Sequence, residues 1–161
     1  MAFAAAQDLL DGIRRATYSV NQLLTMTRAD ASMESEPDTM DAAILIRMTV
    51  SAATPIAAAK RVEIVTSAED GIQLVVRVSD VQLIVSNLVD NAVRYTGRGG
   101  SVHILGRHIE QIYVVEISDT GCGIPEAALP HVYDRFFRAA PPDVEGTGLG
   151  LAIARAAADR N

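Results

Sequence analysis

An apolar stripe with helical spacing runs through residues 1–30. Its members recur at alternating intervals of three and four residues, at Ala6, Leu9, Ile13, Ala16, Val20, Leu23 and Thr27. The pattern continues for about three heptads, the lower limit for recognising a coiled-coil or bundle helix. We therefore predict one helix in this segment. Periodicity alone does not decide whether that helix joins a bundle or packs on its own domain.

The pattern changes in residues 31–41, where carboxylates, serines and a proline interrupt the stripe. We interpret this segment as a linker. Residues 41–60 are alanine-rich and have helical character, although Pro55 should kink or shorten the helix because proline lacks an amide hydrogen. The chain then divides into a partial bundle helix at 1–30, the linker and a domain at 42–161.

Two segments with strand character follow. Residues 61–66 alternate polar and apolar positions, and residues 72–78 are rich in β-branched residues. Glu69, Asp70 and Gly71 provide a turn between them. This arrangement favours a β-hairpin.

The second half of the chain mixes helices and strands. A helix is predicted from Ser79 or Asp80 through Tyr95, with Leu83, Ile84, Leu88 and Val89 on its buried side. The further expected elements are strands at 101–106 and 111–118, one helical turn within 130–138, and a helix at 148–160. This order predicts an α+β fold: a two-layer α/β sandwich with a mixed, mostly antiparallel sheet and helices on one face.

Composition limits the class of protein more than its chemistry. A length of 161 residues allows one domain with a short appendage. The formal net charge of −6 argues against non-specific nucleic-acid binding, which needs a concentrated basic surface. The single cysteine, Cys122, excludes an internal disulfide and fits a reducing compartment.

Two asparagines on the predicted helix form the first chemical cluster, within NLVDNAVRYT at 87–96. Asn87 and Asn91 are four residues apart, so both amides project from one helix face. An amide oxygen can coordinate Mg²⁺ beside phosphate oxygens and water. The alternative is that both amides only bind neighbouring backbone groups.

The other two clusters are rich in glycine. In DTGCGIP at 119–125, Asp119 ends a strand, and its carboxylate could accept hydrogen bonds from an exocyclic amine or bind its own turn. In GTGLGLAIA at 146–154, three glycines precede a helix, whose N-terminal amides can bind an anion. A glycine hinge is the alternative for this third cluster. Its spacing matches neither a Walker A loop nor a dinucleotide fingerprint.

Together the clusters resemble the ATP-binding domain of sensor histidine kinases, a fold shared with type II topoisomerases, heat-shock chaperones and mismatch-repair ATPases. The segment at 87–96 resembles the N box, 119–125 the first glycine box, 134–138 (DRFFR) the F box and 146–154 the second glycine box. The four occur in the family's order. The helix within 1–30 is similar to part of the dimerisation and phosphotransfer domain that precedes this module.

The resemblance implies ATP and Mg²⁺ as cofactors and assigns roles to individual residues. Asn91 would bind the metal, Asn87 would line the phosphate end, Arg94 would contact phosphate and Tyr95 would lie along the nucleotide. Asp119 would recognise the adenine amine in a pocket shaped by Gly121 and Gly123. The second glycine box would close over the triphosphate, through Gly146, Thr147, Gly148, Leu149 and Gly150. Phe136 and Phe137 would anchor this loop, with residues 138–147 as the lid.

The residue type at position 87 distinguishes ATP hydrolysis from phosphoryl transfer. Hydrolytic relatives carry a glutamate at this position that activates water, whereas an amide cannot act as a general base near neutral pH. The resemblance therefore implies transfer of the γ-phosphoryl group of ATP to a histidine, for relay to a response-regulator aspartate. A non-catalytic nucleotide-sensing or protein-interaction module is the alternative, and a chaperone-like ATPase is disfavoured.

Several parts of a complete kinase are expected outside residues 1–161. His103, His108 and His131 lack the sequence context of a phosphoacceptor, so that histidine should lie on a preceding helix. The resemblance also implies further sheet strands after Asn161. We therefore expect no autophosphorylation by this polypeptide alone. The implied partners are the phosphoacceptor domain of the parent kinase and a response regulator. The parent would be a homodimer, and this chain would be cytoplasmic, as the cytoplasmic portion of a membrane-bound sensor.

Overall fold

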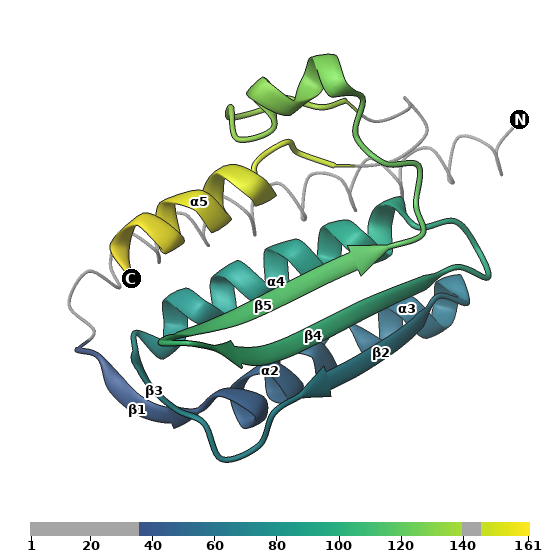
Figure 1. Cartoon of the computed structure of the whole chain (residues 1–161). Coiled ribbons are helices and arrows are strands. Elements are labelled where there is room, and N and C mark those ends of the chain that lie inside the picture. The colour runs from purple at the N-terminus through teal and green to yellow at the C-terminus, as the bar shows by residue number, and fades with distance from the viewer. Residues whose placement is uncertain (1–35, 140–145) are drawn as a thin grey trace, which may run out of the picture.

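The computed structural model describes residues 36–139 and 146–161 (Figure 1). The helix predicted within 1–30, the beginning of the linker and most of the predicted lid lie outside these residues. Residues 38–41, the end of the predicted linker, form strand β1 (Asp38–Asp41) of the folded domain.

The strands form two separate sheets. Strand β1 pairs antiparallel with β3 (Gln73–Val76). The larger sheet has the order β2-β4-β5, in which β2 (Glu63–Ala68) runs parallel to β4 (Ser101–Ile109), and β5 (Ile112–Asp119) runs antiparallel to β4. The sheet is therefore mixed.

The hairpin predicted from residues 61–66 and 72–78 is wrong, because β2 and β3 belong to different sheets. The turn between them is held by the last residue of β1 and the first residue of α2. The amide of Gly71 donates to Oδ2 of Asp41 (2.9 Å), and the amide of Ala42 donates to the carbonyl of Ile72 (2.9 Å). These bonds direct the chain after the turn towards β1, and β4 takes the place beside β2.

The helices largely follow the sequence prediction. Helix α2 (Ala42–Ser51) and helix α3 (Thr54–Lys60) are bent by 48° at their junction. Pro55 lies in the first turn of α3, where its missing amide hydrogen removes no helical bond. Helix α4 spans Val78–Tyr95, and α5 spans Gly150–Arg160. The turn predicted within 130–138 is instead a 3₁₀ helix, η2 (Glu126–His131).

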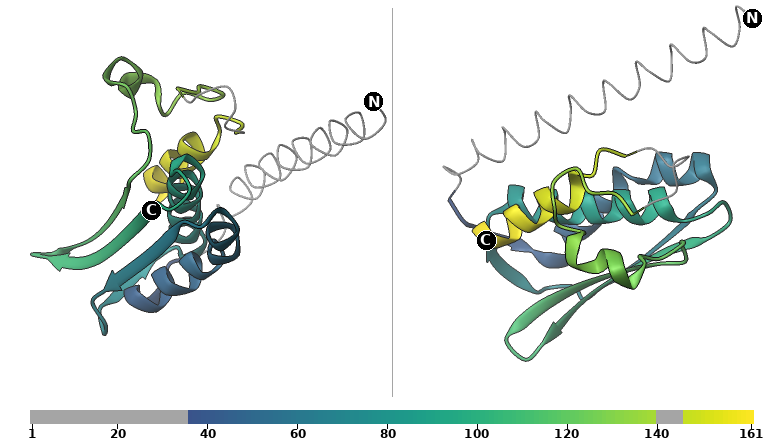
Figure 2. Two further views of the ribbon diagram at one scale, coloured as in Figure 1. Left: turned by 90° about the vertical axis from the view of Figure 1, so that its right-hand side faces the viewer. Right: turned by 90° about the horizontal axis from the view of Figure 1, so that it is seen from above.

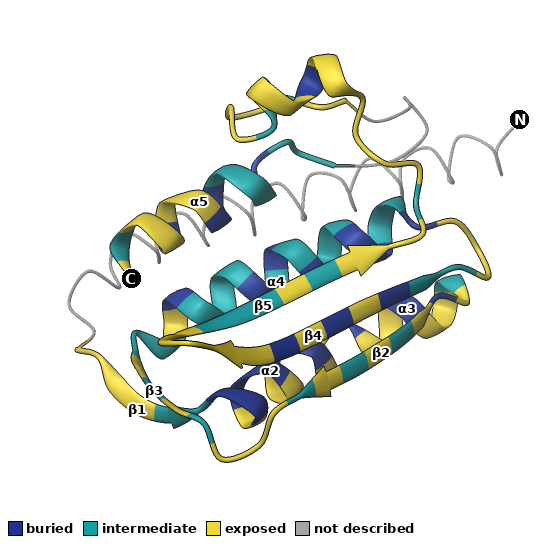
Figure 3. Ribbon diagram, in the orientation of Figure 1, coloured by how far each residue is buried: buried dark blue, intermediate teal, exposed yellow. Residues whose placement is uncertain are grey.

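Helices cover one face of the larger sheet (Figure 2). Along β4, buried and exposed residues alternate, as the two-residue period of a strand requires (Figure 3). Val102 and Ile104 pack with Ile46 of α2 and Val89 of α4 in the core. The opposite face carries exposed side chains such as Leu105. The predicted two-layer α/β architecture is confirmed.

In the described ranges, no single helix has the length and hydropathy to cross a membrane. Helices α2 and α3 meet those criteria of length and composition only as a bent pair.

Candidate functional site

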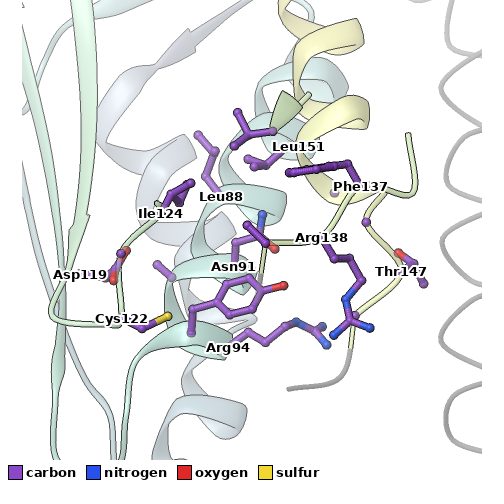
Figure 4. Close-up of a pocket in the computed structure, with 18 of the residues that line it drawn as sticks. Leu88, Asn91, Arg94, Asp119, Cys122, Ile124, Phe137, Arg138, Thr147 and Leu151 are labelled. Atoms are coloured by element: carbon purple, nitrogen blue, oxygen red, sulfur yellow. The ribbon is translucent and has the colours of Figure 1, made fainter. Parts of the chain in front are cut away.

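A cavity of about 290 Å³ opens between the C-terminal half of α4, the end of β5 and the start of α5 (Figure 4). Most of the predicted site residues line it: Asn91, Arg94, Tyr95, Asp119, Gly123, Gly146, Thr147, Gly148 and Gly150. They come from three segments that are distant in sequence. The structure therefore brings the N box and both glycine boxes to one place.

The two asparagines of α4 have different surroundings. Asn91 lines the cavity, and its side chain makes no hydrogen bond to another described residue. Asn87 is buried behind Gly150 and is not part of the lining. Its Nδ2 donates to the carbonyl of Leu83 (2.8 Å), one turn earlier. Thus the alternative of an amide bound to backbone describes Asn87, whereas the amide of Asn91 faces the cavity.

Asp119 combines both of the arrangements considered for it. Its Oδ1 accepts a hydrogen bond from the amide of Gly121 (2.8 Å), which closes a short turn after β5. The same residue lines the cavity. Gly121 lies outside the lining, against α4, where a Cβ would come within 2.5 Å of the carbonyl oxygen of Tyr95. A side chain at position 121 would separate the turn from α4.

The second glycine box is held to the F box through the backbone. Gly148 has φ +70°, and a Cβ there would lie 2.5 Å from the carbonyl carbon of Phe136. The amide of Phe136 donates to the carbonyl of Gly148 (2.8 Å). Phe137 lines the cavity, but the Phe136 side chain is exposed, so only one of the two predicted anchors packs inward. Leu149 is buried beneath the loop rather than lining the cavity.

Some lining residues were missed in the sequence analysis. The most important is Arg138, which ends the F box and reaches the cavity beside Gly146. Its position within DRFFR was the only sequence signal for it. Cys122 also lines the cavity, as do apolar residues that form a wall: Leu88, Ala92, Ile117, Ile124, Val132 and Leu151.

The charges in the cavity are separated. Figure 4 shows Asp119 on one side and Arg94 and Arg138 on the other, with the apolar side chains of Leu88 and Ile124 nearer to Asp119. Such a cavity suits an elongated ligand with an apolar, amine-bearing end and an anionic end.

Two charged groups outside the lining influence α4. Burial raises the pKa of the Asp90 carboxyl, and the charge of Arg94 partly opposes this shift. At the C-terminal end of the helix, Nζ of Lys60 donates to the carbonyls of Val93 (3.0 Å) and Arg94. Burial, together with the nearby Arg94, lowers the pKa of Lys60. Lys60 therefore caps the helix end that carries Arg94 and Tyr95.

The described residues contain no group of three or more histidine, cysteine or acidic side chains that could hold a metal ion. A cation beside Asn91 would therefore need most of its oxygen ligands from a bound molecule and water. None of the three histidines lines the cavity. His131, for example, pairs through Nδ1 with Asp134 (2.9 Å).

Known proteins resemble this chain in sequence. Residues 76–161 match the family described as histidine kinase-, DNA gyrase B- and HSP90-like ATPase. The signal transduction histidine-protein kinase AfsQ2 of Streptomyces coelicolor is 33% identical over 158 residues, which are 96% of this chain and 28% of AfsQ2. The chain spans about a third or less of the length of the curated relatives it matches.

Solved structures give the same result. The mycobacterial sensor histidine kinase MprB aligns with a TM-score of 0.67 and 27% identity, over 74% of this chain and 78% of that one. Full-length ShkA, solved in complex with AMPPNP, aligns with a TM-score of 0.69 and 26% identity, over 88% of this chain and 30% of ShkA.

Proposed function

Because the chain belongs to the family of histidine kinase-, DNA gyrase B- and HSP90-like ATPases, we propose that its cavity binds ATP and that it is the catalytic portion of a sensor histidine kinase. The reaction would transfer the γ-phosphoryl group to a histidine outside residues 1–161. The observation that carries this proposal is the charge separation across the cavity, with Asp119 opposite Arg94 and Arg138.

ATP fits this polarity in one orientation. The adenine ring would lie against the apolar wall, with its exocyclic amine donating to the carboxylate of Asp119. The triphosphate would extend towards the two arginines and the N-terminus of α5, where unpaired amides and the helix dipole favour negative charge. The AMPPNP complex of ShkA supports a nucleotide as the ligand of this fold.

Asn91 is suited to hold Mg²⁺ together with the nucleotide. Its amide is a neutral oxygen ligand on the cavity wall, and the described residues supply no acidic cluster to compete with it. Mg²⁺ is commonly bound by one or two protein oxygens plus substrate phosphates and water. When bound, the metal would neutralise charge on the phosphates. The arginines would orient the γ-phosphoryl group towards its acceptor.

Phosphoryl transfer is favoured over hydrolysis because no general base stands at Asn87. Its amide is buried and hydrogen-bonded to the carbonyl of Leu83, and an amide has no useful basicity near neutral pH. We further propose the phosphoacceptor domain of the parent kinase and a response regulator as partners. The parent protein would be a homodimer, with this portion in the cytoplasm.

Calorimetric titration with Mg-ATP tests the proposal directly, with Mg-GTP as the control. We expect saturable ATP binding at one site and much weaker GTP binding. Failure of this chain, and of a version extended at its C-terminus, to bind ATP would overturn the proposal. Adding the parent's phosphoacceptor domain with γ-labelled ATP should then give phosphohistidine, and its absence despite ATP binding would favour the nucleotide-sensing alternative.

A further inference from the structure

We infer that Asp80 and Arg160 are positioning residues, which fix how far α5 extends along α4 and thereby place the N-terminus of α5 at the phosphate end of the cavity. The inference rests on the proposed function. It concerns residues remote from the cavity, since neither is part of its lining.

The two residues tie together the helix ends that lie away from the cavity. Asp80 is in the first turn of α4 and is 1% exposed. A guanidinium nitrogen of Arg160, in the last turn of α5, donates to its Oδ1 (2.6 Å). Arg77 strengthens the junction, because its side chain donates to the carbonyl of Arg160 (2.7 Å).

The helices run antiparallel, so this junction and the cavity mark opposite ends of one contact. At a rise of 1.5 Å per residue, about 15 Å of α5 separates Gly150 from Arg160, and about 16 Å of α4 separates Asp80 from Asn91. At the cavity end Gly150 faces both asparagines. A Cβ on Gly150 would lie 3.2 Å from Oδ1 of Asn87 and 3.6 Å from the amide of Asn91.

The remainder of the contact between α4 and α5 contains mostly small buried side chains on the α5 side. The buried face of α5 consists of Ile153, Ala154 and Ala157, and two of these are too small to interlock with the partner helix. A specific polar pair at one end is a means of defining register, as buried polar residues do in some coiled coils.

The pair is poorly suited to a purely stabilising role. Oδ2 of Asp80 and Nε of Arg160 are both buried without a hydrogen-bond partner among the described residues. Incompletely satisfied buried ion pairs are often no more stable than apolar residues of similar size. The geometric constraint is therefore the stronger reason for this pair.

The consequence for the ligand depends on which part of it is considered. The adenine end faces Asp119 on β5, and of the residues named in its apolar wall only Leu151 belongs to α5. The phosphate end faces the N-terminus of α5, where a displacement of about 1 Å can weaken a positioned contact severely. Loss of the pair should therefore weaken binding of ATP more than binding of adenosine.

The test compares Mg-ATP and adenosine affinities for the chain and its variants, by calorimetry and NMR titration at a temperature where each is folded by circular dichroism. For Asp80→Asn and for Arg160→Met we expect about a tenfold or greater loss of ATP affinity, with adenosine affinity within about twofold of the original. Arg160→Lys should recover part of the loss. Arg155→Met is the matched control, because it breaks an exposed pair with Asp159 on the same helix.

A double variant separates positioning from simple stabilisation. Asp80→Leu with Arg160→Met removes both charges of the pair and should restore folding stability, yet the ATP-to-adenosine ratio should stay reduced. Restoration of the ratio together with stability would overturn the inference, as would equal losses for ATP and adenosine in the single variants. If the original chain binds ATP and the single variants keep its ATP affinity, only this inference is overturned. Absence of ATP binding by the original chain would overturn both proposals.

Discussion

The backbone amide of Gly121 donates a 2.8 Å hydrogen bond to Oδ1 of Asp119. This bond fixes the orientation of the carboxylate at the end of β5. Oδ2 makes no hydrogen bond to the described residues and belongs to a side chain that lines the cavity. A turn-forming aspartate and an adenine-binding aspartate are therefore compatible roles for one residue, since each uses a different oxygen.

Replacing Asp119 with asparagine should impair adenine recognition while retaining the turn. The amide oxygen can still accept the bond from Gly121, but the second position then presents a donor to the donor amine of adenine. A hydrogen bond to a charged group contributes about 1.5–3 kcal/mol, so we expect roughly a tenfold to hundredfold loss of ATP affinity by calorimetry. Asp159→Asn is the control, because Asp159 lies on the far part of α5. An unchanged ATP affinity of the Asp119 variant would contradict the assigned role.

The two asparagines of α4 should differ when each is changed to alanine. Asn91→Ala should reduce the dependence of ATP binding on Mg²⁺, measured by titration with and without the metal. Asn87→Ala should mainly lower the free energy of unfolding, by about 1 kcal/mol, because it removes the bond to Leu83. If Asn87→Ala, rather than Asn91→Ala, removed the metal dependence, the assignment of the ligand would be reversed.

Cys122 offers a direct probe of the cavity. It is the single cysteine of the chain, it is exposed and it lies in the cavity lining. Saturating ATP should slow its reaction with a maleimide, followed by mass spectrometry, because the nucleotide covers the thiol. Adenosine should protect in the same way, and free triphosphate should not. Equal labelling rates with and without ATP would place the nucleotide elsewhere.

Asp90 provides a test based on pH. Burial raises its pKa in the folded protein above the unfolded value near 3.8, so the folded state binds the proton more tightly. Ionisation therefore costs stability as the pH rises through the unfolded and then the folded pKa. Asp90→Asn should stabilise the protein at pH 7, with a smaller gain at about pH 4.5, in urea unfolding. A gain that grows as the pH falls would have the wrong sign.

Lys60 should contribute through its cap on α4. Lys60→Met keeps much of the apolar stem and removes the bonds to the carbonyls of Val93 and Arg94. We expect a loss of about 1–2 kcal/mol in the free energy of unfolding. Arg155→Met, which alters an exposed surface pair, should change the same quantity by less than about 0.5 kcal/mol. Comparable values for the two variants would show that the cap is not stabilising.

The sequence predicted the positions of the helices and strands better than it predicted which strands pair with each other. Helical and strand periods located α4, α5, β4 and β5 because each records which side of an element is buried. The partner of β2 could not be read in this way. The same alternation serves a hairpin with β3 and a parallel pairing with β4. In the structure Asp41 of β1 holds the turn at Gly71, and β3 pairs with β1 instead of β2.

The residues of the candidate site were likewise predicted only in part. Asn91, Asp119 and the second glycine box were found because their residue types and order are unusual. Arg138 and Lys60 were not singled out, since basic residues are common on surfaces and their roles depend on contacts between distant segments. Only the fold shows that Lys60, at the end of α3, reaches the last turn of α4.

The backbone contact between Gly148 and Phe136 joins the second glycine box, which lines the cavity, to the F box. A ligand that favours one arrangement of the second glycine box must also favour one arrangement of residues 136–137. Linkage between two binding sites is reciprocal. A molecule that binds the exposed Phe136 ring and selects that arrangement would change the affinity for the nucleotide by some factor. The nucleotide would change the affinity for that molecule by the same factor. The close backbone approach that the positive φ of Gly148 permits thus connects the lining of the cavity to a residue on the outer surface.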